Sequence, residues 1–524
     1  MTREKERFVS RDPGRVAIYS CGVTPYDESH LGHARPAIFF DVVRRYLTRR
    51  GWQVRYVQNF TDVDDKIIAR ANQRGEPPLE LAARYADDYL SVMDVLGVHR
   101  ADAYPKVSEH IELIVQMVSR LVEKGHAYVA SNGDVYFAVE TFPQYGKLSH
   151  QRLEDVMAGA RVEVGETKRN PADFAVWKAA KPGEPSWPSP WGPGRPGWHI
   201  ECSAMSLHYL GNHFDIHGGG VDLVFPHHEN EIAQSEAFTG EPPFARHWLH
   251  NGLITTRSEK MSKSLGNFTT IRALLGQYPA PFLRFFLLSV HYRTPLEFSP
   301  ETIANAWRGW QRLLLAWQQV YAREQAVRSR VGAAGLGADA GRQPGGGSAG
   351  DEGRAGNDHP LSPLEQAVAA SRTSFDEAMQ DDFNTAVAIS SLFELARQVN
   401  SQAAADPPVD DPGVARGWLA AATAFRDLGV DILGVLPDDP NRALQSASPA
   451  AAAAAGSGNE TAPGGVTPAN WSALVELILE LRQRARARKD WTEADEIRRR
   501  LGEVGIVVED TPQGSRWRWQ PKGV

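Results

Sequence analysis

The sequence of 524 residues predicts an α/β protein: a Rossmann-type domain with a parallel sheet and a connective insertion, followed by helical domains and a small C-terminal helix-hairpin module. Residues 15–21 and 52–60 have the apolar character of buried strands, and residues 34–46 between them have helical character. A strand, a helix and a strand in this order form half of a nucleotide-binding fold. Beyond Pro300, helical patterns alternate with stretches rich in Gly and Ala.

The predicted domains follow from where these patterns change. We expect residues 1–100 to form the first half of the sheet domain, 101–195 the connective insertion and 196–299 the second half. The insertion has a helical pattern at 108–124 and a strand-like pattern at 134–139. A helical domain is predicted at 300–438, with helices at 300–328, 363–404 and 413–436 and a flexible linker at 331–358. A second linker at 439–468 precedes the C-terminal module at 469–524, which should contain helices at 471–488 and 492–504 and strands at 506–509 and 515–519.

A first motif, His30-Leu31-Gly32-His33, lies between the first strand and its helix. Two histidines three residues apart share a face of a helix, where they could simply be core or capping residues. Gly32 favours another interpretation, because a residue without Cβ lets a nucleotide approach the backbone closely. Phosphate oxygens bind at helix N-termini, and open α/β sheets bind ligands at the carboxyl ends of their strands.

A second motif, Lys260-Met261-Ser262-Lys263-Ser264, is expected in a loop of the second half. A short basic run is often just a solvated turn. Lys260 and Lys263 are, however, mobile cations of the kind that stabilises the charge developing on phosphate oxygens during transfer. Removing one such donor typically costs about 3 to 4 kcal/mol of barrier.

The chain has only two cysteines, Cys21 at the end of the first strand and Cys202. A disulfide and two inert buried thiols are the simple alternatives; without a signal peptide, a reducing compartment disfavours the disulfide. His227 and Glu231 follow Pro226, which suits a helix start, and their spacing of four puts them on one face. Two cysteines, a histidine and a glutamate suit Zn²⁺. His228, at a spacing of three from Glu231, competes with His227 as the ligand.

The two motifs together resemble the signature motifs of class I aminoacyl-tRNA synthetases, with Leu31 where the family most often has isoleucine. The resemblance implies that His30 and His33 contact the phosphates of ATP, which enters with Mg²⁺, and that Lys263 grips the triphosphate. It further implies amino-acid adenylation followed by transfer to tRNA.

Within this class the cysteines and their partners resemble those of the cysteinyl-tRNA synthetases. The resemblance implies one zinc per chain, held by Cys21, Cys202, His227 and Glu231, and it favours His227 over His228. L-cysteine, ATP and the cysteine-specific tRNA would be the substrates. The remaining implied contacts are Thr61 and Trp198 in the cysteine pocket and Gly219, Gly220 and Asp222 in the adenosine-binding turn. A helix N-cap for Thr61 and a core aromatic for Trp198 are the structural alternatives.

The net charge of −7 argues against a nucleic-acid partner only if charge is evenly distributed. The segment 515–519 alternates Arg and Trp, which suits base stacking and phosphate contact as well as a simple hydrophobic face. We expect it to contact the anticodon, in a cytoplasmic monomer without a membrane span. Two alternatives stay open. A cysteine:amino-sugar ligase of mycothiol biosynthesis would share the site but not need residues beyond 470, and a non-catalytic tRNA-binding protein would not need both motifs.

Overall fold

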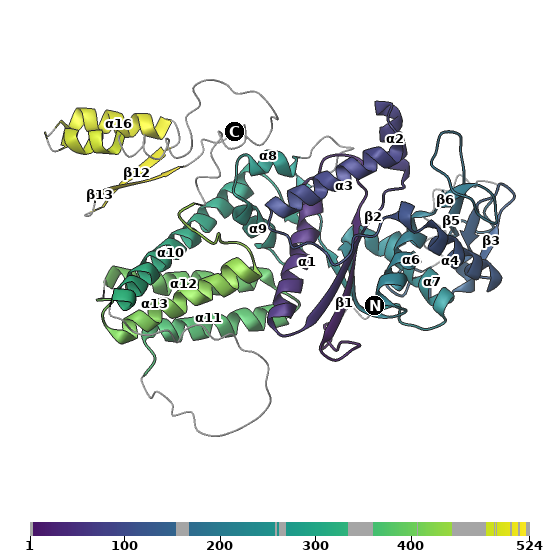
Figure 1. The fold of residues 1–524 in the computed structure, drawn as a ribbon, viewed down its shortest axis with the longest axis horizontal. Helices are drawn as coiled ribbons and strands as arrows, with labels where there is room; N and C mark the ends of the chain where they lie inside the picture. Colours follow the sequence, from purple (N-terminus) through teal and green to yellow (C-terminus); the bar gives the residue numbers. More distant parts are fainter. Residues whose placement is uncertain are drawn as a thin grey trace.

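The computed structural model describes residues 4–152, 167–256, 259–260, 269–333, 360–405, 407–442, 478–486, 488, 490–503, 506–511 and 514–519. Its centre is a four-stranded sheet in the order β2-β1-β7-β8, with every neighbouring pair parallel (Figure 1). This sheet confirms the predicted fold class. Its strands are β1 (Arg15–Val23), β2 (Gln53–Phe60), β7 (Phe214–Gly220) and β8 (Ala245–Asn251).

Helices cover both faces of this sheet, because neighbouring side chains of β1 point to opposite faces. On one face Ile18 packs with Phe39 and Phe40 of helix α1 (Leu31–Arg49). On the other face Tyr19 packs with Ile200 of α6 (Trp198–Leu210) and with α7 (Glu229–Thr239). The carboxyl edge of the sheet therefore lies between α1 and the start of α7.

The connective region forms a sheet of its own, in the order β3-β4-β5-β6 and antiparallel throughout. The helix predicted at 108–124 is in fact a 3₁₀ turn, Val107–Glu109, followed by α4 (Ile111–Glu123), because His110 leaves the helical conformation at φ −124° and ψ 20°. The other elements between β2 and α6 are α2 (Asp65–Arg74), α3 (Pro78–Val95), β3 (Ala127–Val129), β4 (Val135–Phe137), β5 (Phe174–Ala179) and β6 (Gly194–Pro196).

After β8 the chain forms a small sheet in the order β10-β9-β11. Strand β9 (Ile254–Thr256) pairs antiparallel with β10 (Glu259–Lys260) and parallel with β11 (Leu296–Glu297). Between β10 and β11 lie the short helices α8 (Ile271–Leu275) and α9 (Ala280–Leu288).

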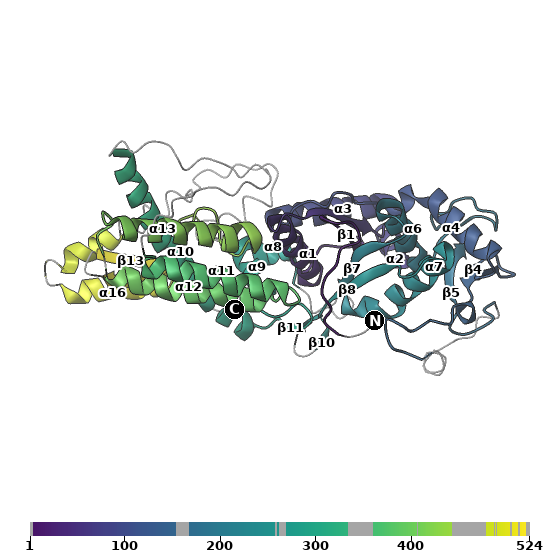
Figure 2. The same ribbon diagram turned by 90° about the horizontal axis from the view of Figure 1, so that it is seen from below.

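The helical domain packs four long helices around buried tryptophans, among them Trp310, Trp317 and Trp418. Figure 2 shows this bundle beyond α1 and α9 at one end of the molecule, with the connective sheet at the other end. The helix predicted at 363–404 is divided at 381–384, where Asp382 and Phe383 have positive φ angles of 58° and 50°. The helices are α10 (Pro300–Ala333), α11 (Pro363–Gln380), α12 (Thr385–Ala405) and α13 (Pro412–Ala424), the last continued by a π-helical segment, Phe425–Ile432.

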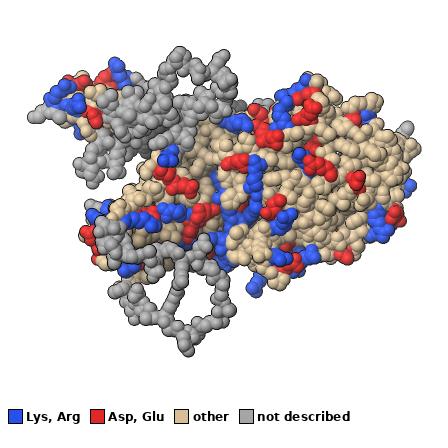
Figure 3. Space-filling model, in the orientation of Figure 1, with Lys and Arg blue, Asp and Glu red and all other residues tan. Residues whose placement is uncertain are grey.

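Basic and acidic side chains stand side by side where the end of α1 meets this bundle (Figure 3). Arg49 pairs with Asp427 at 3.1 Å and Arg50 with Asp376 at 3.4 Å. The positive charge of this junction is thus matched by carboxylates of the bundle, and it joins two domains rather than forming an open basic surface.

The C-terminal segment contains α16 (Trp491–Glu503) and the antiparallel pair of β12 (Ile506–Thr511) and β13 (Gly514–Trp519). Ile506 is opposite Trp519, so the predicted hairpin is present. Of the helix predicted at 471–488, residues 478–486 are helical and 471–477 lie outside the described residues, as do nearly all of the two predicted linkers.

Candidate active site

Side chains able to bind a metal converge at the carboxyl edge of the parallel sheet. Cys21 lies near the end of β1 and His217 on β7, while Cys202 comes from α6. His227 belongs to a π-helical turn, Val224–His228, that leads directly into α7, and Glu231 lies in the first turn of α7. Four separate parts of the chain thus deliver donors to one place.

The four donors expected from the sequence lie together. The Cys21 Sγ is 3.7 Å from the Cys202 Sγ and 3.4 Å from the Glu231 Oε1. The His227 Nε2 is 3.0 Å from that same oxygen, so the spacing of four does put both residues on one face. Sulfur, imidazole and carboxylate donors at these separations fit a metal ion with four ligands.

A second set overlaps with the first. Cys21, His217, His228 and Glu231 also bring one donor atom each within 4.8 Å of the others. The His228 Nε2 is 3.3 Å from the Cys21 Sγ and 3.9 Å from the Glu231 Oε1. Both sets share Cys21 and Glu231, and only the first contains both thiols.

The electrostatics of the group separate the two adjacent histidines. Burial raises the pKa of the Glu231 carboxyl, but the imidazoles of His217 and His227 outweigh it and lower that pKa to about 2. Burial likewise lowers the pKa of His227, yet the Glu231 charge raises it to about 10. For His228, burial and the neighbouring His217 and His250 hold the pKa well below its ordinary value. Glu231 and His227 thus favour each other's charged forms, while burial favours the neutral form of His228.

The predicted histidine motif forms the N-terminus of α1. The His30 Nδ1 accepts a hydrogen bond from the Gly32 N–H at 3.1 Å, and the His33 Nδ1 accepts one from the His30 N–H at 3.2 Å. The two rings stack with centroids 3.9 Å apart. Because each Nδ1 accepts, each neutral ring carries its proton on Nε2.

Gly32 has a structural reason within this cap. A Cβ atom at this position would lie 2.8 Å from the His30 ring. A side chain here would push His30 off the helix terminus, so the glycine preserves the cap as well as leaving the backbone open.

The lysine motif is only partly described. Lys260 lies in β10, where its backbone pairs with Thr255, whereas Lys263 lies outside the described residues. Just beyond the motif, Thr270 bridges to His30 and the Ile271 N–H donates to the Ser29 carbonyl oxygen at 3.0 Å. Thr270 and Ile271, which follow the motif in the sequence, are thus attached to the chain at the histidine cap.

Trp198 is the first residue of α6 and remains 40% exposed, which excludes a core role. Its ring stacks on His227 with centroids 4.4 Å apart. Thr61 is buried at the end of β2 and accepts a bond from the Asn59 side chain at 3.3 Å; the N-cap of α2 is Asp64. Trp198 therefore lies beside the metal-binding group, and Thr61 is not a helix cap.

Gly219 and Gly220 of the predicted adenosine turn are the last residues of β7, and Asp222 lies in the 3₁₀ turn Val221–Leu223 that follows. A Cβ atom on Gly219 would lie 2.8 Å from Leu223 and 3.2 Å from the His228 ring, and one on Gly220 would collide with the Asp222 carboxylate. A side chain at either position would therefore displace Leu223, His228 or Asp222, beside the donors already described.

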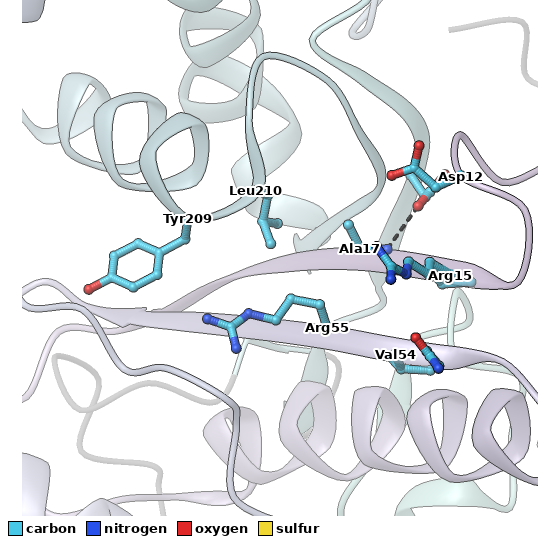
Figure 4. A pocket seen from close by; sticks show the side chains of 10 residues that line it. Asp12, Arg15, Ala17, Val54, Arg55, Tyr209 and Leu210 are labelled. Atoms are coloured by element: carbon cyan, nitrogen blue, oxygen red, sulfur yellow. Dashed lines mark hydrogen bonds between the residues drawn. The ribbon is translucent and has the colours of Figure 1, made fainter.

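A pocket of about 320 Å³ lies at the opposite end of the sheet (Figure 4). Arg15 and Ala17 of β1, Arg55 of β2 and Tyr209 of α6 line it. Asp215, which also lines it, already accepts bonds from the backbone N–H groups of Arg11 and Ala17. The pocket is far from the metal-binding group and lacks its set of donors, so we do not assign it to the site.

The sequence interpretation assigned no role to His199, His217 and His250, which lie beside the donor group. The His217 Nε2 is 2.8 Å from the Glu231 Oε2, and the His228 Nδ1 is 2.8 Å from the His250 Nε2. The His199 Nδ1 is 3.0 Å from the His227 Nδ1. The available signal was position, because His217 and His250 both lie near the carboxyl ends of strands.

Comparisons with known proteins decide the family. A family model described as "tRNA synthetases class I (C) catalytic domain" matches residues 7–308, a "DALR domain" matches 374–437, and a "Cysteinyl-tRNA ligase anticodon binding domain" matches 471–518. The chain is 52% identical to the cysteine–tRNA ligase of Pelotomaculum thermopropionicum, over 99% of both chains. It is 49% identical to that of Heliobacterium modesticaldum, over 99% of this chain and 98% of the relative.

The chain belongs to the cysteine–tRNA ligase family. It is an enzyme of the class I aminoacyl-tRNA synthetases, and these matches give no support to the amino-sugar ligase. Among solved structures, the Mycobacterium tuberculosis methionyl-tRNA synthetase in complex with methionyl-adenylate shares the fold, with a TM-score of 0.58 and 16% identity over 87% of this chain and 99% of that one. None of the helices in the described ranges is both long enough and apolar enough to cross a membrane.

Proposed function

We propose that this family member activates L-cysteine with ATP, releasing pyrophosphate, and transfers cysteine from cysteinyl-adenylate to the 3′-terminal adenosine of its tRNA. The observation that carries the proposal is the group of two cysteines, a histidine and a glutamate at the carboxyl edge of the sheet. The identity to cysteine–tRNA ligases over nearly the full chain supports it.

Cys21, Cys202, His227 and Glu231 would hold one Zn²⁺ per chain. The donor separations and the mixture of thiol, imidazole and carboxylate support this assignment. Bound zinc supplies a thiolate-selective contact, because sulfur is a far better zinc ligand than a serine hydroxyl. A directional contact of this kind discriminates by about 10⁴ to 10⁵, whereas an apolar pocket reaches only about 10².

The remaining residues divide between cysteine and ATP. Trp198, stacked on His227, and the buried Thr61 would form walls of the cysteine pocket. Gly219, Gly220 and Asp222 would receive the adenosine, whose triphosphate arrives with Mg²⁺.

The triphosphate would lie at the N-terminus of α1. There the Nε2–H groups of His30 and His33 can donate to phosphate oxygens, a role that their Nδ1 hydrogen bonds support. Lys260 and Lys263 would supply positive charge to the α-phosphate and the departing pyrophosphate.

The C-terminal module, 469–524, would contact the anticodon, in line with the family model at 471–518. We further propose that the enzyme works as a monomer in the cytoplasm. Neither property is needed for adenylation, so each is open to a separate test.

The deciding experiment supplies the purified chain with cysteine, ATP and radiolabelled pyrophosphate, and then with either cysteine-specific tRNA or an amino-sugar acceptor. We expect cysteine-dependent exchange and acylation of the tRNA alone. Replacing Lys263 with alanine should abolish most of the exchange; near-normal exchange in that variant, or acylation of the amino sugar, would overturn the assignment.

A further inference from the structure

Arg35 of α1 connects two separate chain segments, one that leads into β9 and one that leads into β11. Strand β9 pairs with β10, the strand that contains Lys260 and is called the lysine strand below. The Arg35 Nη1 donates to the carbonyl oxygens of Gly252 at 2.7 Å and Leu253 at 3.2 Å. Its Nη2 donates to the carbonyl oxygens of Thr294 at 2.5 Å and His291 at 3.3 Å. We call this arrangement the Arg35 clamp. Only 2% of the residue is exposed, so the clamp is shielded from water.

The chemistry of the clamp indicates that Arg35 positions the two segments rather than simply stabilising the fold. In the part of the chain that the structure describes, no carboxylate forms an ion pair with Arg35, and burial lowers the pKa of its guanidinium to about 10. Burying a cation without a counter-ion is costly. A guanidinium is nevertheless planar and presents its donors in a fixed fork, so four carbonyl bonds set the relative position of the two segments.

The two segments bound by Arg35 lead into the two strands that form a sheet with the lysine strand. Leu253 immediately precedes β9, and β9 pairs directly with β10, so that Thr255 lies opposite Lys260. The second segment leads into β11, which pairs with the other edge of β9 through Leu296 and Ile254. The clamp therefore holds the chain at the starts of β9 and β11, the two strands of this sheet other than β10, and β9 in turn places the Lys260 backbone.

Arg35 and His33 lie on the same helix, and His30 is the N-cap of that helix. The clamp therefore also sets the position of the lysine strand relative to the histidine cap. The far end of the lysine segment is tied to that cap through the Thr270–His30 bridge. Gly252 and Leu253 before the lysine motif are thus bound to α1, and Thr270 after it is bound to the N-cap of α1.

The helical domain supports the same segment from outside. The Asp382 carboxylate accepts bonds from the Tyr292 Oη at 2.8 Å and from the Arg293 Nε and Nη2 at 2.7 Å and 2.9 Å. Asp382 reaches them from a turn with a positive φ of 58°, a conformation that residues other than glycine seldom adopt. These three bonds hold the turn against the segment.

We propose that Arg35 is a positioning residue for adenylation, which sets the Lys260 strand against the His30–His33 cap, with Asp382 as its outer support. The inference rests on the proposed function, because it assigns the lysine strand to ATP. Misplacement of catalytic groups by about 1 Å can cost about 10² in rate, and the loss should appear in the turnover number.

The test compares Arg35→Lys and Arg35→Met with Arg284→Lys. Arg284 is an equally buried arginine that bonds Asp41 of α1 and the carbonyl oxygens of Leu433, Leu96 and Gly97, but not the clamped segments. With active sites titrated, Arg35→Met should lower kcat of cysteine-dependent exchange about 10²-fold. Arg35→Lys should recover part of that loss. Metal content and the KM for cysteine should stay at the wild-type values, and Arg284→Lys should lose stability without losing kcat.

Amide hydrogen exchange tests the same proposal without depending on enzyme activity. Amide hydrogen exchange at 253–256 and 259–260 should accelerate in the Arg35 variants and in the milder Asp382→Asn, while α10–α13 keep their protection. Wild-type kcat per active site, wild-type protection of these strands, or an equal loss of kcat in Arg284→Lys would overturn the proposal. Absence of exchange activity in the wild-type enzyme would instead reject the proposed function, and the amide protection would still decide the role of Arg35.

Discussion

Replacing each of the two adjacent histidines with alanine should separate the metal ligand from its neighbour. In a tetrahedral zinc site with Zn–S near 2.3 Å and Zn–N or Zn–O near 2.05 Å, donor atoms lie about 3.8 Å apart for two sulfurs and about 3.6 Å for sulfur and oxygen. Cys21 and Cys202 are separated by 3.7 Å, and Cys21 and Glu231 by 3.4 Å. The pair of thiols thus already has zinc-ligand spacing, and only the set with His227 uses it.

The second carboxylate oxygen supports the same choice. The Glu231 Oε2 accepts from His217 at 2.8 Å, while Oε1 faces the His227 Nε2 at 3.0 Å. His217 therefore orients the carboxylate through the oxygen that the metal would not use, as outer partners of metal ligands commonly do. In the alternative set His217 would have to be both ligand and neighbour of the same carboxylate.

The magnitudes follow from these roles. Structural zinc sites bind with about 10 to 16 kcal/mol in total, so one of four ligands contributes about 3 kcal/mol or somewhat more. His227→Ala should weaken zinc binding about 10² to 10³-fold, since about 1.4 kcal/mol is a factor of ten. His228→Ala, which removes a supporting imidazole, should weaken it at most about 10 to 100-fold.

Zinc affinity is measured by competition with a chromophoric chelator, on protein whose metal content has been determined by mass spectrometry. His126→Ala is the matched control, because His126 bonds to Thr141 in the connective region. It should leave the affinity unchanged. A greater loss in His228→Ala than in His227→Ala would refute this assignment of the ligand.

Three further changes test other parts of the molecule. Gly32→Ala should lower cysteine-dependent pyrophosphate exchange while sparing zinc content, because its Cβ would lie 2.8 Å from the His30 ring; unchanged exchange contradicts this reading of the cap. Burial raises the pKa of Asp41, but Arg284 and Arg45 outweigh burial and hold that pKa below its ordinary value. The ionised Asp41 therefore stabilises the folded state fully above its unfolded pKa of about 3.9, and this stabilisation is lost as the pH falls through the folded pKa. Asp41→Asn should lower the free energy of unfolding, measured in urea at pH 7, by about 3 to 5 kcal/mol and make that free energy less dependent on pH below about pH 4. An unchanged pH dependence would contradict this role of Asp41. Deleting residues beyond 439 should spare adenylation and weaken tRNA charging, whereas full charging would remove the C-terminal module from recognition.

The sequence was sufficient where function depends on residue type and local spacing. His30 and His33 were expected at a helix start, and they form a reciprocal cap there. His227 and Glu231 were expected on one face, and they remain on one face although His227 lies in a π-helical turn. Local chemistry also gave the hairpin that pairs Ile506 with Trp519.

The sequence was insufficient where a contact depends on the order of strands in the sheet. His217 meets Glu231 because β7 lies between β1 and β8, an arrangement that no local pattern encodes. The break at Asp382 has the same origin. Its segment looks helical in isolation, but the bonds to Tyr292 and Arg293 stabilise a left-handed turn. Tertiary contacts override local preference at both places.

Helix α1 unites these separate parts of the site. Its first turn orients the two histidine rings, its second turn bears Arg35, and Asp41 on the same helix bonds Arg284 at the junction with the helical domain at 2.7 Å. The donor group for the metal, in contrast, comes from β1, α6 and the start of α7. A disturbance of the first two turns of α1 should therefore impair the handling of ATP before it affects metal binding. Recognition of the amino acid and positioning of the phosphates thus have different structural supports, which is why variants of Arg35 and of His227 should fail in different assays.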